Sequence, residues 1–178
     1  LEYLTNTYET NLIIMSHSNG FPIPPEEFKL QHGRDYPIIK QLENILVRRG
    51  KAKNYRVLNG IYTPHETKCI IGKCDMMISG RLHGAVAALS QEIPTVIIDY
   101  GHEPKAHKLR GIAELCEVEE YLVDPNQSND LIKKVDKCFN DRFELKKHLT
   151  KRIPIVKQLA ESNFIEIKNT LIKLGIIN

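Results

Sequence analysis

Two hydrophobic patterns take turns along this chain. Short, nearly unbroken apolar runs predict buried strands within 11–21, 55–60, 75–80, 93–100 and 120–124. The stretches between them predict helices over 35–50, 63–74, 81–92 and 103–116, and the apolar spacing is clearest in the first. Residues 128–174 have the pattern of two or three amphipathic helices rich in Lys and Glu. The prolines within 22–34 predict an irregular loop.

The ends of two predicted helices carry capping signals. Asp35 is the expected N-cap of the helix over 35–50, and Gly50 follows its last turn as the expected C-cap. Thr63 and Glu66 have the spacing of a capping box.

Strands that alternate with helices, each strand apolar throughout, predict a parallel sheet covered on both faces with right-handed crossovers. The expected fold class is therefore α/β: a Rossmann-like parallel sheet with helices on both faces over residues 1–127. A C-terminal helical extension over 128–178 follows it.

Composition narrows the function only a little. The formal net charge of +3 over 178 residues does not call for nucleic acid, yet it would not repel an anionic ligand. The four cysteines form no CxxC pair, which favours reduced structural thiols over a zinc site. We find no apolar run long enough to span a membrane and no signal peptide. The chain begins with Leu1 in mid-pattern, so we expect an excised piece whose partner half is missing.

Polar groups gather where the predicted strands end, which is where ligands bind in open parallel sheets. These groups are Ser16, His17, Ser18, Asn19 and Gly20; Asn59 and Gly60; Ser79, Gly80, Arg81, Leu82 and His83; and 99–105, which includes Tyr100 and Lys105. We expect them to converge on one crevice.

Arg81 and His83 stand at the start of a predicted helix, where free N–H groups and the helix dipole favour an anion. An arginine grips a carboxylate or phosphate with two donors, and a histidine exchanges protons near neutral pH. Lys105 adds a cation near the next helix start. Ordinary surface roles for these residues fit the spacing equally well. GxGxxG and GxxxxGK[ST] motifs are absent, which disfavours a dinucleotide site and a P-loop.

The stretch from Glu66 to Lys105 resembles the C-terminal half of the polysaccharide pyruvyl transferases. The matching residues are Glu66, Ile71, Cys74 and Asp75, then Ser79, Arg81, Leu82 and His83, then Ile93, Pro94, Tyr100 and Lys105. The similarity extends back to His17, at the end of the first strand, although Met15 and Ser16 depart from the family pattern. It extends weakly forward to about Asp124.

This resemblance implies one half of a glycosyltransferase B-like architecture that transfers a pyruvyl group from phosphoenolpyruvate to a sugar. His83 is then the expected acid and base, Arg81 binds the donor's carboxylate or phosphate, and Lys105 neutralises the departing phosphate. Lys108 replaces Lys105 if two extra residues after Tyr100 shift the position. Expected substrate-binding residues are Ser79, Gly80, Leu82, His17, Ser18, Tyr100 and Lys108. Neither a metal nor a cofactor is expected.

The resemblance also implies partners. The acceptor is expected to be a sugar or lipid-linked glycan of a cell-surface polysaccharide, handled in the cytoplasm. A lipid-linked acceptor would bring weak association with the inner membrane surface. Without its N-terminal half, the chain should bind weakly and not turn over. The apolar stripe of Ile155, Leu159, Phe164, Ile167 and Leu171 suits docking onto that half or onto the chain's own domain.

Two other functions fit the same residues. One is a glycosyltransferase domain that binds a nucleotide sugar, with Asp99 or Glu103 available for the ribose hydroxyls. The other is a non-catalytic Rossmann-like module that keeps the Arg-Leu-His triplet by descent.

Overall fold

The computed structural model describes residues 1–100 and 107–177. The chain divides into two compact units, residues Leu1–Thr67 and Lys68–Asn178. The domain boundary that the sequence predicts after residue 127 stays a prediction.

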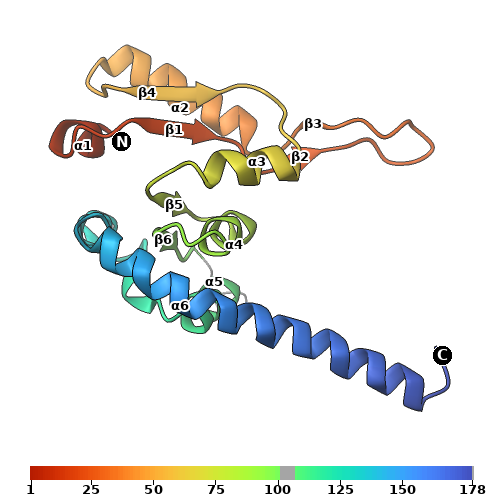
Figure 1. The fold of residues 1–178 in the computed structure, drawn as a ribbon. Coiled ribbons are helices and arrows are strands. Elements are labelled where there is room, and N and C mark those ends of the chain that lie inside the picture. Colours follow the sequence, from red (N-terminus) through yellow and green to blue (C-terminus); the bar gives the residue numbers. More distant parts are fainter. Residues whose placement is uncertain (101–106, 178) are drawn as a thin grey trace. The chain divides into compact units, whose positions relative to one another are not determined.

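The first unit is built on two parallel strands. Strands β1 (Leu12–Met15) and β4 (Tyr55–Leu58) pair in parallel, with Leu12 opposite Tyr55 (Figure 1). Helix α1 (Glu2–Thr7) precedes β1, and α2 (Tyr36–Arg49) lies between the two strands in sequence. Helix α2 packs near β1 and buries Ile39 and Leu46. Both strands predicted for this unit are therefore present.

All four residues predicted to cap helices lie at the expected positions. Gly50 ends α2 in the left-handed conformation, with φ 59°, and its N–H donates to the carbonyl of Leu46. Asp35 is the N-cap of α2 by position, although its side chain makes no capping bond. Helix α3 (Pro64–Ile71) begins with a true capping box: the Thr63 N–H donates to the Glu66 carboxylate at 2.8 Å, and the Glu66 N–H donates to the Thr63 hydroxyl at 3.3 Å. The bonds that the Thr63 N–H and hydroxyl donate to its carboxylate lower the pKa of Glu66.

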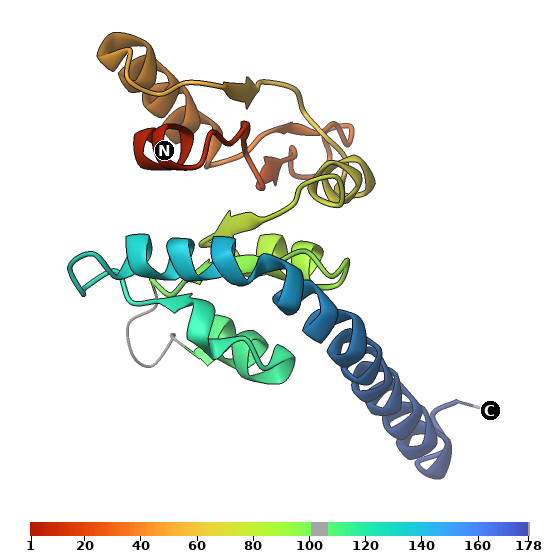
Figure 2. The ribbon, with the colours of Figure 1, turned by 60° about the vertical axis from the view of Figure 1, so that its left-hand side comes forward.

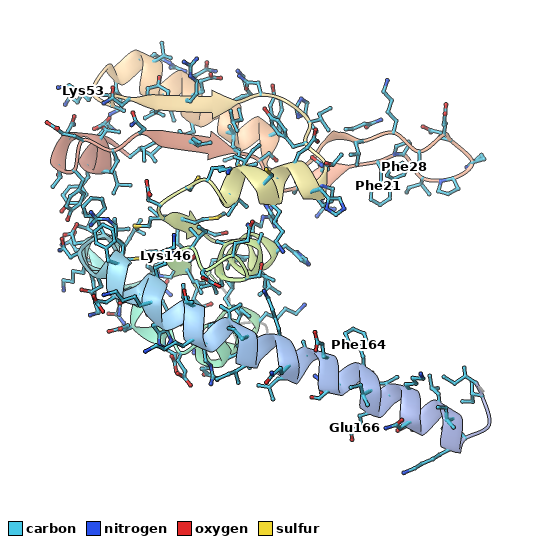
Figure 3. The ribbon with its side chains drawn as sticks, in the orientation of Figure 1. Phe21, Phe28, Lys53, Lys146, Phe164 and Glu166 are labelled. Atoms are coloured by element: carbon cyan, nitrogen blue, oxygen red, sulfur yellow. The ribbon has the colours of Figure 1, made fainter. Side chains whose placement is uncertain are left out.

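A short hairpin occupies the region where the sequence predicts only a loop. Strands β2 (Asn19–Gly20) and β3 (Gln31–His32) pair antiparallel. The exposed rings of Phe21 and Phe28 lie beside each other next to this pair, with their centroids 5.7 Å apart (Figure 3). Strands of two residues are too short to leave an alternating pattern in the sequence, so the pairing could not be predicted.

The second unit contains a three-stranded parallel sheet. Its strands are β5 (Met77–Ser79), β6 (Thr95–Ile98) and β7 (Leu122–Val123), with β6 in the middle. Helices α4 (Leu82–Leu89) and α5 (His107–Cys116) pack against the sheet, and a 3-10 turn, η1 (Glu119–Tyr121), precedes β7. Val96 and Ile97 at the centre are fully buried. The α/β class with parallel sheets is confirmed, and it is compatible with a Rossmann-like fold.

The prediction of two or three C-terminal helices is wrong. A single helix of 44 residues, α6 (Asp130–Lys173), covers this region. Pro154 suggests a break, because proline removes one N–H donor and crowds the preceding turn. The helix nevertheless continues through Pro154. Its first half packs on α5, β6, β7 and η1, and its second half extends beyond these elements (Figures 1 and 2).

The cysteines are reduced thiols, and two of them are buried. All four cysteines are free, and Cys116 and Cys138 are buried. Burial raises the pKa of Cys116 to about 11 and that of Cys138 to about 12, so both remain protonated near neutral pH. None of the helices within the described residues is long and apolar enough to cross a membrane.

Candidate functional site

The turn between β5 and α4 is held by a buried serine. The Ser79 hydroxyl donates to the carbonyl of Arg81 at 3.0 Å and accepts the Arg81 N–H at 3.1 Å. These two bonds keep Arg81 extended, with φ −104° and ψ 127°, as the N-cap of α4. The carbonyl of Arg81 then accepts the first helical bond, from the N–H of Ala85. Ser79 therefore fixes the backbone conformation of the turn that carries Arg81.

Helix α4 presents its N-terminus at the carboxyl end of β5. The N–H groups of its first turn have no acceptor within the helix, and the helix dipole adds positive potential there. The side chains of Arg81 and His83 are exposed at this end. A guanidinium, an imidazole and free N–H donors around one helix start suit a small anion. Anion binding at this turn stays a prediction.

Gly84 allows α4 to approach β5 closely. A Cβ at this position would lie 2.6 Å from the Ser79 Oγ and 3.2 Å from the Met77 Cε. Any larger residue would therefore push the Ser79 hydroxyl away from Arg81 and disturb the turn.

We expect Gly84→Ala to destabilise the fold by about 1–3 kcal/mol, since overpacking displaces a hydroxyl that is fixed by two hydrogen bonds. Urea unfolding followed by circular dichroism measures this. The matched control is Gly111→Ala in α5, where an added Cβ meets nothing within 4 Å. That change should stabilise the chain by about 0.5–1 kcal/mol. Equal effects at the two glycines would contradict the close approach of α4 to β5.

Tyr100 lies beside the same turn. Because β5 and β6 are parallel neighbours, with Ser79 opposite Ile97, their carboxyl ends share one edge of the sheet. A Cβ at Gly80 would lie 3.5 Å from the Cδ1 of Tyr100. The structure therefore brings Tyr100 together with the predicted turn residues, from Ser79 to His83. Their roles in binding and catalysis stay predictions.

Of the two candidate lysines, Lys105 and Lys108, the structure describes only Lys108. Lys105 lies outside the described residues, as do His102 and Glu103. Lys108 is exposed in the first turn of α5. The choice between Lys105 and Lys108 stays open.

His17 and Ser18 belong to the first unit, directly after β1. The Ser18 hydroxyl accepts the N–H of Arg34 at 3.1 Å, and a Cβ at Gly33 would overlap the Ser18 carbonyl. Ser18 is thus tied to the segment after β3, an arrangement that the sequence analysis missed. The expected convergence of His17 and Ser18 with the turn at Arg81 stays a prediction.

Asp99 has a partner that the sequence analysis did not find. Its buried carboxylate accepts a hydrogen bond from the Arg110 Nε at 2.6 Å. A pocket of about 290 Å³ adjoins the pair, with the following lining: Asp99, Arg110, Leu122, Val123, Asp124, Gln127, Asp130 and Lys134. A basic residue in the helix after a strand that ends in Asp is the only sequence signal for this pairing. Asp99, considered above for ribose hydroxyls, is thus engaged with an arginine of its own unit.

Among the residues that the structure describes, no group of three or more His, Cys, Asp or Glu side chains could hold a metal ion. The polar side chains at the β5–α4 turn are instead the guanidinium of Arg81 and the imidazole of His83.

The fold is of the α/β class with parallel sheets and is compatible with a Rossmann-like fold, and its second unit carries a strand-to-helix turn with Arg81 and His83. The family model described as polysaccharide pyruvyl transferase matches residues 8–102, more than half of the chain. The chain belongs to the polysaccharide pyruvyl transferase family. No curated protein and no solved structure matches it significantly. The matched range includes the loop after β1 and the whole β5–α4 turn, and it ends before Lys105 and Lys108.

Proposed function

We propose that this chain is the C-terminal half of an enzyme that transfers a pyruvyl group from phosphoenolpyruvate to a sugar of a cell-surface polysaccharide or its precursor. The observation that supports this most is the β5–α4 turn. It presents Arg81 and His83 at a helix N-terminus, inside the range that the family model matches.

The chemistry of the donor fits these groups. Phosphoenolpyruvate carries a carboxylate and a phosphate, so its binding needs cations and N–H donors. Arg81 binds one of the two anionic groups, and the backbone at Leu82 contributes a donor. Gly80 and Tyr100 border the donor, and Ser79 holds the turn. His17 and Ser18 approach the donor from the first unit.

His83 exchanges the proton in the reaction. It protonates the methylene carbon, which becomes the methyl group, while a sugar hydroxyl attacks C2. The C2–O bond to phosphate then breaks and phosphate leaves. A second sugar hydroxyl attacks C2 and closes the ketal. Of the two hydroxyl protons, one replaces the proton that His83 gave and the other leaves with phosphate. Lys105 or Lys108 neutralises the departing phosphate. The scheme uses neither a metal nor a cofactor.

The proposal includes partners. The acceptor is a sugar or lipid-linked glycan, and the N-terminal half of the same protein completes the site. The enzyme acts in the cytoplasm, with weak attachment to the inner membrane surface if the acceptor is lipid-linked. This half alone binds the donor but does not turn over.

An amide chemical-shift titration of the chain with phosphoenolpyruvate tests the donor assignment. We expect shifts over residues 79–84, and Arg81→Ala should weaken binding by about 10- to 100-fold because a charge-assisted pair is lost. Lys146→Ala, which removes an exposed cation on α6 (Figure 3), should leave the affinity unchanged. Shifts with a uridine-diphosphate sugar alone would favour the glycosyltransferase interpretation and overturn ours.

A further inference from the structure

Helix α6 has an apolar face along its whole length. Ile155 and Leu159, which the sequence analysis placed in one stripe with Phe164, lie outside this face at about 100° per residue. In the first half, the residues of this face are buried against the rest of the second unit: Val135, Cys138, Leu145, Leu149 and Ile153. The same face continues through the second half, with Val156, Ala160, Phe164, Ile167, Leu171 and Leu174. At about 100° per residue these six positions fall within a stripe of about 80°. We call these six residues the distal seam.

The distal seam is the exposed continuation of a buried face. Phe164 is 74% exposed, Ile167 56% and Leu174 66%. Phe164 and Glu166 point to opposite sides of the helix (Figure 3). The side away from the seam is mostly polar but also exposes Ile165 and Ile172. Exposed apolar residues in a contiguous stripe, rimmed by polar ones, mark an interaction surface.

The charges around the seam favour a protein partner over a lipid surface. The second half of α6 carries Lys157, Lys168 and Lys173 against Glu161 and Glu166. Helices that lie in a membrane interface carry a strongly basic polar face. The nearly balanced charge of this segment is instead typical of the flanks of a coiled coil.

The spacing of the seam fits a second helix. From Ile153 to Leu174 the apolar positions advance 21 residues in six steps, an average of 3.5. This is the repeat at which two helices keep a common seam along their length. The stretch from Val156 to Leu174 is about 27 Å long.

The orientation of such a pair follows from what already occupies the helix. Up to Ile153 the same face is covered by the chain's own sheet and by α5. If two copies paired in parallel, the sheet and α5 of one copy would lie at the same end of the pair as those of the other, and they would collide. An antiparallel pair places them at opposite ends.

The charges agree with this orientation. Glu161 and Lys168 lie one heptad apart on the same flank of the seam. Antiparallel helices that cross near Phe164 bring like flanks together, so Glu161 of each copy faces Lys168 of the other. We propose that the distal seam binds the distal seam of a second copy of this chain in an antiparallel two-helix coiled coil. The proposal does not depend on the reaction proposed above.

The molar mass of the chain, measured by light scattering up to about 100 µM, tests the proposal. We expect a dimer of the 20.4-kDa chain at the upper concentrations. Phe164→Glu should raise its dissociation constant at least about tenfold, as loss of an interface anchor does, and Ile167→Lys should act alike. Gln158→Glu adds the same charge on the opposite side of α6 and should leave the dimer intact.

A monomer at every concentration, or a dimer indifferent to Phe164→Glu, contradicts the proposal. So does binding to anionic vesicles by a chain that stays monomeric. The enzyme with its N-terminal half should also dimerise. A monomer there, with 156–174 protected from hydrogen exchange, would show that the other half covers the seam instead.

Disulfide crosslinking tests the orientation. Two copies of Phe164→Cys should crosslink, whereas two copies of Leu171→Cys lie about 20 Å apart in the antiparallel pair and should not. The unsubstituted chain, which has an exposed Cys69, is oxidised alongside as the control. Crosslinking of Leu171→Cys as efficient as that of Phe164→Cys contradicts the antiparallel arrangement.

Discussion

Replacing His83 by alanine in the enzyme that carries both halves should lower kcat for pyruvyl transfer by about 10²–10⁴-fold, the usual contribution of a general acid. The affinity for phosphoenolpyruvate should change little, because Arg81 and the N–H groups of α4 remain. His83 is exposed at the N-terminus of α4, so its loss leaves no cavity in the core. The effect should therefore fall on the chemical step.

Single-turnover kinetics and donor titration separate these two quantities. His65→Ala is the matched control, since His65 is an exposed histidine of α3 that no step of the reaction uses. Unchanged turnover in His83→Ala removes the histidine from catalysis. A loss of donor affinity as large as the loss of turnover would instead assign His83 to binding.

The parts of the site that could be predicted depend on residues close together in sequence. The capping box of Thr63 and Glu66, the left-handed Gly50 and the turn from Ser79 to His83 all join positions at most a few residues apart. Patterns of this kind follow from backbone geometry and from one or two side chains, so the sequence indicates them directly.

What escaped prediction depends on contacts between distant segments. The bond of Arg110 with Asp99 and that of Arg34 with Ser18 each join residues more than ten positions apart in sequence. Helix α6 continues through Pro154 because one lost hydrogen bond does not outweigh the rest of a long helix. The buried residues of α6 all precede Pro154. Packing on the sheet, rather than local helix propensity, therefore fixes the first half of the helix.

The second large effect is expected on the free energy of unfolding, when the packing of the first half of α6 is weakened. Leu149 is fully buried in the first half of α6, which packs on α5 and the sheet of the second unit. Its replacement by alanine removes three carbon atoms from a packed site, and such changes cost about 2–5 kcal/mol. Leu159→Ala makes the same change ten residues later, at a position 47% exposed, and should cost at most about 0.5 kcal/mol.

Urea unfolding of both variants, at protein concentrations too low for self-association, measures the difference. A large loss of stability in Leu149→Ala alone would mean that the first half of α6 is part of the core of the second unit, although it follows the last strand. The first half of the helix would then be rigidly packed on the sheet, and the exposed second half would extend from it. Equal losses in both variants would mean that the second half is also packed in solution, against the exposures seen here.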